Sequence, residues 1–281
     1  MASRDESSRS AWLFNRLAPN TVRVLGPSDA QLAELDERFL AHSLSSPSVS
    51  VPSTLLGIAL KAASAEDTRE RRGARAFLQF VDQIAYGLGE RLSPPLVSRL
   101  RSEMQALFLD FNANQSNHMN KLAELAVFEY LLRVGASILA FEAPLPPPST
   151  KKADVLIQPL AGSQADRPFV EIVNVHAVAT RVQTEADMNA FLDARAAQKR
   201  SAKQIGGDAA DVLLVIVLWF KGSDSLPDLK RWAPWLLARA DRRPAEWVMT
   251  LIQLGDENGA RTWEFDRVPA IVAKWNLLAS V

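Results

Sequence analysis

Up to about residue 112, apolar residues recur at the three-to-four spacing of amphipathic helices. Turn signals separate the periodic stretches, and Ser93-Pro94-Pro95 is typical of a helix start. The first fourteen positions are polar and charged, so we expect a frayed terminus there and no secretory signal. The pattern therefore predicts a helical N-terminal region over residues 1–115, with its clearest helices at 32–40, 77–88 and 97–108.

The pattern changes after residue 115. A Leu-, Ala- and Glu-rich stretch at 116–134 predicts a helix that ends at Gly135, a typical C-cap. Short runs rich in Val and Ile follow, separated by turn residues, and such runs predict strands. The expected strands are 137–142, 153–158, 169–176, 212–220, 247–254 and 262–265, and the expected helices are 185–205, 226–240 and one from 269. The strand at 212–220 is fully apolar and needs cover on both faces.

This order of elements predicts an α/β fold, with a mixed central sheet flanked by helices. The α/β domain is expected over residues 116–281 and includes a Trp-rich C-terminal extension. The strands around residues 154 and 171 should be neighbours, flanked by the helices at 117–134 and 185–205. The tryptophans of the extension, Trp232, Trp235 and Trp247 among them, are expected to pack in a core or an interface.

Composition excludes several functional classes. The chain has no cysteine, which excludes a disulfide scaffold, a thiolate metal site and a cysteine nucleophile, and its three histidines disfavour an all-protein zinc site. Thirty-two basic and 32 acidic residues give a net charge of zero, so the molecule as a whole does not attract polyanions. The longest apolar run has nine residues, whereas a helix needs about 20 to span a bilayer. We expect a cytoplasmic, bacterial-type protein with no membrane partner.

Two carboxylates stand out in the predicted strands. Asp154 opens the second strand directly after Lys151-Lys152, and Glu171 lies in the middle of an otherwise apolar strand. A charge in such a place is costly unless it is paired or binds a cation. If the two strands are neighbours, both carboxylates can converge on one hard cation, and oxygen ligands suit Mg²⁺. The alternative is an ordinary pair of carboxylates at strand ends.

This arrangement resembles the restriction-endonuclease-like superfamily, which is named for its PD-(D/E)XK motif. The resemblance covers roughly residues 117–220: a helix with Glu124, a strand, Asp154, the run Glu171-Ile172-Val173, then a helix and a strand. It implies that Asp154 and Glu171 bind Mg²⁺ or Mn²⁺, with Glu124 assisting from the helix. It also implies a metal-dependent endonuclease that cleaves DNA phosphodiesters.

The chain departs from the family motif at its lysine. Val173 stands at the lysine position, and a valine cannot orient or activate an attacking water. Lys152 is the first candidate replacement, because strand alternation puts it on the same face as Asp154. Lys199 and Lys203 are the second candidate, because they share one helix face and resemble family members whose lysine has moved to the following helix.

The same helix offers candidate contacts to nucleic acid. Gln204, beside Lys199 and Lys203, resembles a glutamine found on this helix in several nuclease branches. These three residues are therefore candidates for nucleic-acid binding. The alternative is that the two lysines belong to an ordinary solvated helix face.

Two functions remain open. The first is a divergent Mg²⁺- or Mn²⁺-dependent nuclease acting on DNA, and retention of both acidic positions favours it. The second is a catalytically inactive nuclease-fold protein that serves as a nucleic-acid or protein-interaction module, and the missing lysine and the neutral charge favour it. An α/β core unrelated to nucleases is a further alternative. The pattern indicates no oligomeric state and does not separate DNA from RNA.

Overall fold

The computed structural model describes residues 9–45, 55–104, 117–158, 167–176, 182–206, 211–220, 225–243, 245–255 and 261–278. The chain forms two compact units, residues 1–125 with 257–262 and residues 126–256 with 263–281. The division falls within helix α8 (Asn117–Arg133). The first unit is helical, and the second carries the sheet.

The helical unit confirms the expected N-terminal helices and adds shorter ones. Its helices are α1 (Arg9–Leu17), α2 (Pro19–Leu25), α3 (Asp29–Ser45), α4 (Leu55–Ala63), α5 (Arg69–Arg91) and α6 (Pro94–Glu103). The end of the helix expected over 97–108 lies outside the described residues. Asp82 of α5 fixes the start of α2, since its carboxylate accepts hydrogen bonds from the Thr21 amide (2.8 Å) and the Asn20 side chain (2.9 Å).

The expectation of a frayed terminus over the first fourteen residues is wrong for residues 9–14. These positions begin α1, which buries Leu13 and Phe14. The amide and hydroxyl of Ser10 both donate to Asp36 of α3. The burial of two large apolar side chains and the hydrogen bonds to Asp36 stabilise a helix that is too short to be stable on its own.

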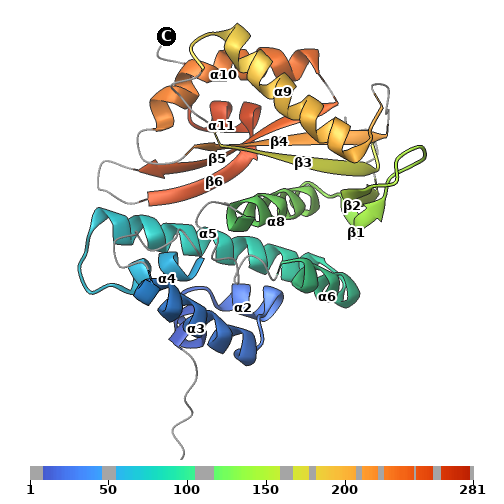
Figure 1. Ribbon diagram of the computed structural model, residues 1–281. Helices are drawn as coiled ribbons and strands as arrows, with labels where there is room; N and C mark the ends of the chain where they lie inside the picture. The colour runs from blue at the N-terminus through green and yellow to red at the C-terminus, as the bar shows by residue number, and fades with distance from the viewer. Residues whose placement is uncertain are drawn as a thin grey trace, which may run out of the picture. The chain divides into compact units, whose positions relative to one another are not determined.

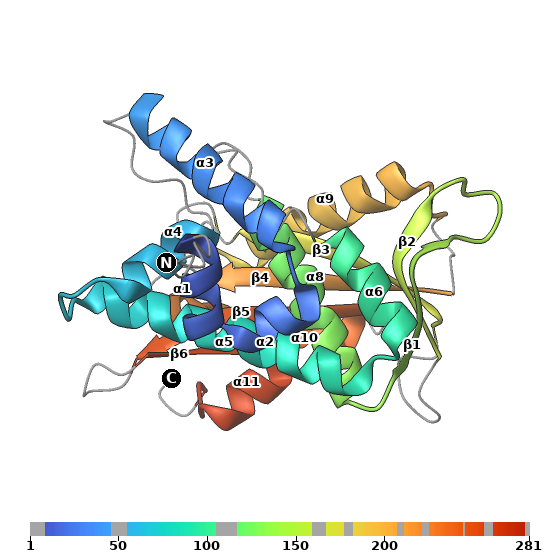
Figure 2. The same ribbon diagram turned by 90° about the horizontal axis from the view of Figure 1, so that it is seen from below.

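The second unit contains one six-stranded sheet with the spatial order β1-β2-β3-β4-β5-β6 (Figure 1). The first three strands are antiparallel neighbours, while β3, β4 and β5 run parallel. The β1–β2 hairpin forms one edge of the sheet (Figure 2). The strands are β1 (Ser137–Pro144), β2 (Lys152–Gln158), β3 (Phe169–His176), β4 (Val212–Phe220), β5 (Glu246–Gly255) and β6 (Arg261–Arg267).

Helices cover both faces of this sheet. Figure 1 shows α9 (Glu185–Lys203), α10 (Ser225–Arg242) and α11 (Val268–Lys274) on one face and α8 on the other. On the α9 face, alternate residues of β3, β4 and β5 join a buried apolar cluster with the three helices. On the other face, Phe128 of α8 packs on Phe141 of β1 with ring centroids 4.9 Å apart. Every residue of β4 is buried, as a fully apolar strand requires.

The predicted mixed α/β fold is therefore confirmed. The neighbouring placement of the strands around residues 154 and 171 is confirmed as well, because β2 and β3 pair through Val155–Val170 and Leu156–Phe169. Trp232 and Trp247 are buried, which confirms the packing role expected for them. Among the described residues, no helix is long and apolar enough to cross a membrane.

Candidate functional site

The antiparallel pairing of β2 and β3 brings Asp154 and Glu171 together. The Glu171 side chain is fully buried, and that of Asp154 is only 11% exposed. The Ile172 amide of β3 donates a hydrogen bond of 2.7 Å to Asp154 Oδ2, which fixes this carboxylate against the neighbouring strand. Among the described residues, neither oxygen of Glu171 accepts a hydrogen bond of good geometry. The two carboxylates thus lie next to each other at one buried position on the sheet.

Two lysines of α9 reach this pair of carboxylates. Lys199 Nζ lies 3.0 Å from Asp154 Oδ2 and 3.0 Å from Glu171 Oε2. Lys203 Nζ, one turn later, lies 3.1 Å from Asp154 Oδ1 and 3.3 Å from Glu171 Oε1. Each ammonium group therefore bridges both carboxylates, one on each side. We refer to these four residues as the charge quartet.

Lys203 also donates to a third oxygen, the backbone carbonyl of Lys152 at 2.5 Å. Its ammonium group is thus surrounded by three oxygen atoms, two from carboxylates and one from a carbonyl. Hard cations such as Mg²⁺ and Mn²⁺ take this kind of oxygen set, completed by water. Among the described residues, no group of three or more His, Asp or Glu side chains is arranged to hold a metal ion. A metal here would therefore rely on two carboxylates, the carbonyl and solvent.

The buried charges perturb each other. Burial raises the pKa of Glu171 to about 7, and the negative charge of Asp154 adds to this effect. Burial would also raise the pKa of Asp154, but Lys199, Lys203 and the Ile172 amide lower it below its ordinary value. Burial lowers the pKa of Lys199, yet Asp154 and Glu171 outweigh it and raise that pKa overall. Asp154 and Lys199 are therefore charged near neutral pH, while Glu171 is present in both its protonated and its ionised form.

Helix α9 is anchored at its start by a capping box. The Thr184 side chain accepts a hydrogen bond from the Asp187 amide (3.1 Å), and the Asp187 carboxylate accepts one from the Thr184 amide (3.0 Å). The Thr184 hydroxyl lowers the pKa of the Asp187 carboxylate most, and the amides of Gln183 and Thr184, which donate to it, lower it further. The helix therefore begins at a fixed position in the chain.

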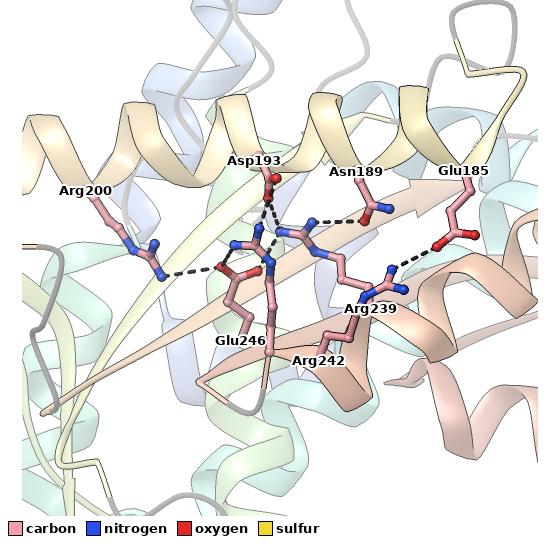
Figure 3. A network of polar contacts seen from close by, with 8 residues as sticks. Glu185, Asn189, Asp193, Arg200, Arg239, Arg242 and Glu246 are labelled. Atoms are coloured by element: carbon pink, nitrogen blue, oxygen red, sulfur yellow. Dashed lines mark hydrogen bonds and ion pairs between the residues drawn. The ribbon is translucent and has the colours of Figure 1, made fainter.

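An ion network around the buried Arg239 and Glu246 fixes the middle of α9 (Figure 3). Arg239 of α10, which is 1% exposed, lies 2.7 Å from both Asp193 of α9 and Glu246 at the start of β5. Arg200 of α9 and Arg243 reach the same Glu246 carboxylate at 3.4 Å. The network joins α9 to α10 and β5, so the helix that carries the two lysines cannot slide along the sheet without breaking its ion pairs to the buried Arg239 and Glu246.

The end of α9 is held by the loop between β1 and β2. Ser149 Oγ donates to the Lys203 carbonyl at 2.7 Å, and Gln204 Oε1 accepts from the amide (3.0 Å) and hydroxyl (3.1 Å) of Thr150. Gln204 ends the helix in the left-handed conformation, with φ of 56°. We refer to these contacts as the loop latch. They fix the backbone beside Lys203.

The structure brings together four of the residues predicted for the site: Asp154, Glu171, Lys199 and Lys203. The side chain of Lys152, the first candidate for the missing lysine, is exposed at the start of β2, and its carbonyl faces Lys203.

The other predicted residues have different surroundings. Glu124 pairs with Lys121 at 2.8 Å, three residues earlier on α8. Gln204, a candidate for nucleic-acid contact, bonds to Thr150 in the loop latch. Val173 is buried in the apolar cluster that includes residues of α9.

Three parts of the site were not predicted from the sequence. These are the Lys152 carbonyl, the Ile172 amide and the loop latch. The first two are backbone groups, which carry no signal in residue type. The Ser149-Thr150 pair after a proline run is a typical turn composition, but nothing in it indicates a partner some 54 residues away.

Comparisons of the chain with protein-family models, curated proteins and solved structures found no match. The charge quartet and the elements that hold it are therefore the features that indicate the function.

Proposed function

We propose that this chain is a Mg²⁺- or Mn²⁺-dependent phosphodiester hydrolase of the PD-(D/E)XK type, acting on DNA. Asp154 and Glu171 are its metal ligands, and Lys199 takes the role of the lysine that Val173 replaces. One observation carries the proposal: Lys199 Nζ bridges the two carboxylates at 3.0 Å each, from the helix that follows β3. A lysine on that helix is the second of the two replacements that the sequence suggests.

The topology around the quartet supports the proposal. The chain order is α8, β1, β2, β3, α9 and β4, with Asp154 on the second strand and Glu171 on the third. The resemblance to the superfamily implies this same order, with the acidic residues on these same strands. Adjacent antiparallel placement of β2 and β3 is what lets the two carboxylates act as one site.

The chemistry divides between the metal and Lys199. When bound, Mg²⁺ would polarise a phosphoryl group and stabilise the negative charge that develops on its oxygens. Lys199 is held protonated by the carboxylates, since they raise its pKa. Its Nζ therefore acts as a fixed donor that orients an attacking water or a phosphate oxygen, and not as a general base. As a metal ligand Glu171 would be in its ionised form, so with a pKa raised to about 7 it would release its proton when the metal binds.

One observation favours the alternative, an inactive nuclease-fold module. The two carboxylates and two ammonium groups of the quartet neutralise each other without any bound ion. A quartet of this kind can serve as a buried structural ion cluster alone. The two functions differ in whether Lys199 affects cleavage or only stability.

The test is metal-dependent cleavage of single- and double-stranded DNA, with RNA as a further substrate. Wild type should cleave at least one of them with Mg²⁺ or Mn²⁺, and Asp154→Asn should abolish cleavage. Lys199→Met should lower the rate about 10²–10³-fold, the usual cost of removing one fixed hydrogen-bond donor. Lys274→Met is the matched control, because Lys274 pairs with Glu264 at 2.8 Å, outside the quartet.

Three results would contradict the proposal. Absence of cleavage by folded wild type on every substrate would support the inactive module. Cleavage that survives Lys199→Met would remove the role given to Lys199. Loss of cleavage in Lys152→Ala, with Lys199→Met still active, would show that the strand lysine replaces the missing one.

A further inference from the structure

Lys203 and Lys199 have different surroundings in the charge quartet. Lys199 contacts two oxygens, both from carboxylates. Lys203 contacts three, namely Asp154 Oδ1, Glu171 Oε1 and the Lys152 carbonyl, at 3.1, 3.3 and 2.5 Å. A carbonyl oxygen beside two carboxylates is a set that hard cations prefer. The Lys203 ammonium thus occupies the position in the quartet that best fits a divalent ion.

We propose that Lys203 is a tethered cation that competes with the divalent metal for one position, so that metal and phosphodiester bind with positive cooperativity. This inference rests on the proposed metal site. A metal and an ammonium group cannot occupy the same three oxygens, because both are cations and the space is buried. Lys203 must therefore leave before the metal binds.

The cooperativity follows from charge. When Lys203 leaves Asp154 and Glu171, its ammonium group loses its anionic partners. A phosphodiester bound at the site supplies a new negative partner for this ammonium group, which lowers the free energy needed to displace Lys203. Binding of each ligand therefore favours binding of the other. The metal displaces Lys203, whose ammonium group can then pair with the phosphate. The phosphate, in turn, pairs with Lys203 and so leaves the metal position vacant. By linkage the two effects are equal.

The loop latch determines how Lys203 can move. Ser149 holds the Lys203 carbonyl, and Thr150 holds Gln204, so the backbone at the end of α9 is fixed. The displacement is therefore a rotation of the long lysine side chain. Its side chain is 20% exposed, which leaves a route to solvent. Lys199 stays on the opposite carboxylate oxygens.

The first experiment measures Mn²⁺ binding by calorimetry, with and without dimethyl phosphate as the smallest phosphodiester. Dimethyl phosphate should strengthen Mn²⁺ binding to wild type, within the roughly 5- to 150-fold range that is usual for coupled sites. Lys203→Met should bind Mn²⁺ at least about tenfold more tightly than wild type, and the effect of dimethyl phosphate should shrink to the part that comes from its direct contact with the metal. Lys151→Met is the matched control, because it removes an exposed positive charge nearby without vacating the metal position.

Two results would overturn the inference. Lys203→Met could bind Mn²⁺ no more tightly than Lys151→Met, which would show that Lys203 is no competitor. Dimethyl phosphate could strengthen Mn²⁺ binding equally in wild type and Lys203→Met, which would show that the phosphate acts through the metal and not through Lys203.

A second measurement uses the wild-type chain, in case removal of Lys203 impairs folding. Nuclear magnetic resonance of lysine ammonium groups should show those of Lys199 and Lys203 protected from solvent in the absence of metal, with Lys203 assigned through Lys203→Arg. Mg²⁺ should abolish protection of Lys203 and leave that of Lys199. Continued protection of Lys203 at saturating Mg²⁺ would contradict displacement.

These experiments do not read out cleavage, so the two proposals can fail separately. A protein that binds Mn²⁺ in competition with Lys203 but cleaves nothing would refute the proposed function and leave this inference standing. Cleavage that depends on Lys199, combined with Mn²⁺ binding insensitive to Lys203, would do the reverse.

Discussion

Glu171 should make the protein less stable as the pH rises from about 4.5 to 7. The folded protein raises the pKa of this buried carboxyl from its ordinary value of 4.5 to about 7. Between these two values the folded chain keeps a proton that the unfolded chain has released. The free energy of unfolding therefore falls with rising pH in this window and levels off above it. The perturbation that isolates the effect is Glu171→Gln, which keeps the size of the side chain and removes its titration.

The expected magnitude follows from the two pKa values. Their difference of about 2.5, at about 1.36 kcal/mol for each pH unit, gives about 3.4 kcal/mol. The side chain is fully buried, so solvent does not screen this effect away. Relative to Glu171→Gln, wild type should thus lose up to about 3.4 kcal/mol of stability between pH 4.5 and pH 7.

Urea unfolding followed by tryptophan fluorescence is the suitable assay. Six of the seven tryptophans lie after residue 210, so the signal reports mainly on the unit that contains Glu171. Unfolding curves of wild type and Glu171→Gln would be compared across this pH range, with Glu264→Gln as the control for loss of a carboxylate elsewhere. If wild type and Glu171→Gln change in parallel with pH, the reasoning about the buried carboxyl is wrong.

Three further predictions concern the surroundings of the quartet. Arg239→Met should lower the free energy of unfolding by about 3–5 kcal/mol, and adding Glu246→Leu should restore much of it in urea unfolding; a fully additive double variant would contradict a buried ion pair. Val173→Lys should lower the thermal midpoint more than Val173→Met does, since it puts a charge into an apolar cluster; equal midpoints would contradict this. Gln204→Ala should lower the free energy of unfolding by about 1 kcal/mol, because its hydrogen bonds to Thr150 are lost. An unchanged urea midpoint would show that the loop latch contributes nothing to stability.

The order of strands and helices was largely predictable because the apolar pattern changes period along the chain. The run from Val212 to Phe220 predicted a strand covered on both faces, and β4 is such a strand. The adjacency of Asp154 and Glu171 followed from placing both on neighbouring strands. The start of the chain was missed, because α1 is short and becomes stable only through the burial of Leu13 and Phe14.

The partners of the two carboxylates were less predictable. Strand alternation favoured Lys152, which is near Asp154 in sequence, whereas the ammonium groups on the carboxylates come from 45 and 49 residues away. Which helix face meets the sheet depends on tertiary packing, here on the contacts of the buried Arg239 with Asp193 and Glu246. Local pattern cannot indicate such contacts.

The separation between the carboxylates and lysines also has a consequence for how the chain folds. Strands β2 and β3 are antiparallel and close in sequence, so they can pair early. Helix α9 belongs to the crossover between the parallel strands β3 and β4, and such crossovers close later because more chain must be ordered first. A nascent chain that ends after β3 therefore carries both carboxylates and none of their ammonium partners. Glu171 can be buried without a large loss of free energy only when α9 docks and supplies its ammonium partners. Docking of α9 and burial of the acidic pair should therefore be one cooperative event.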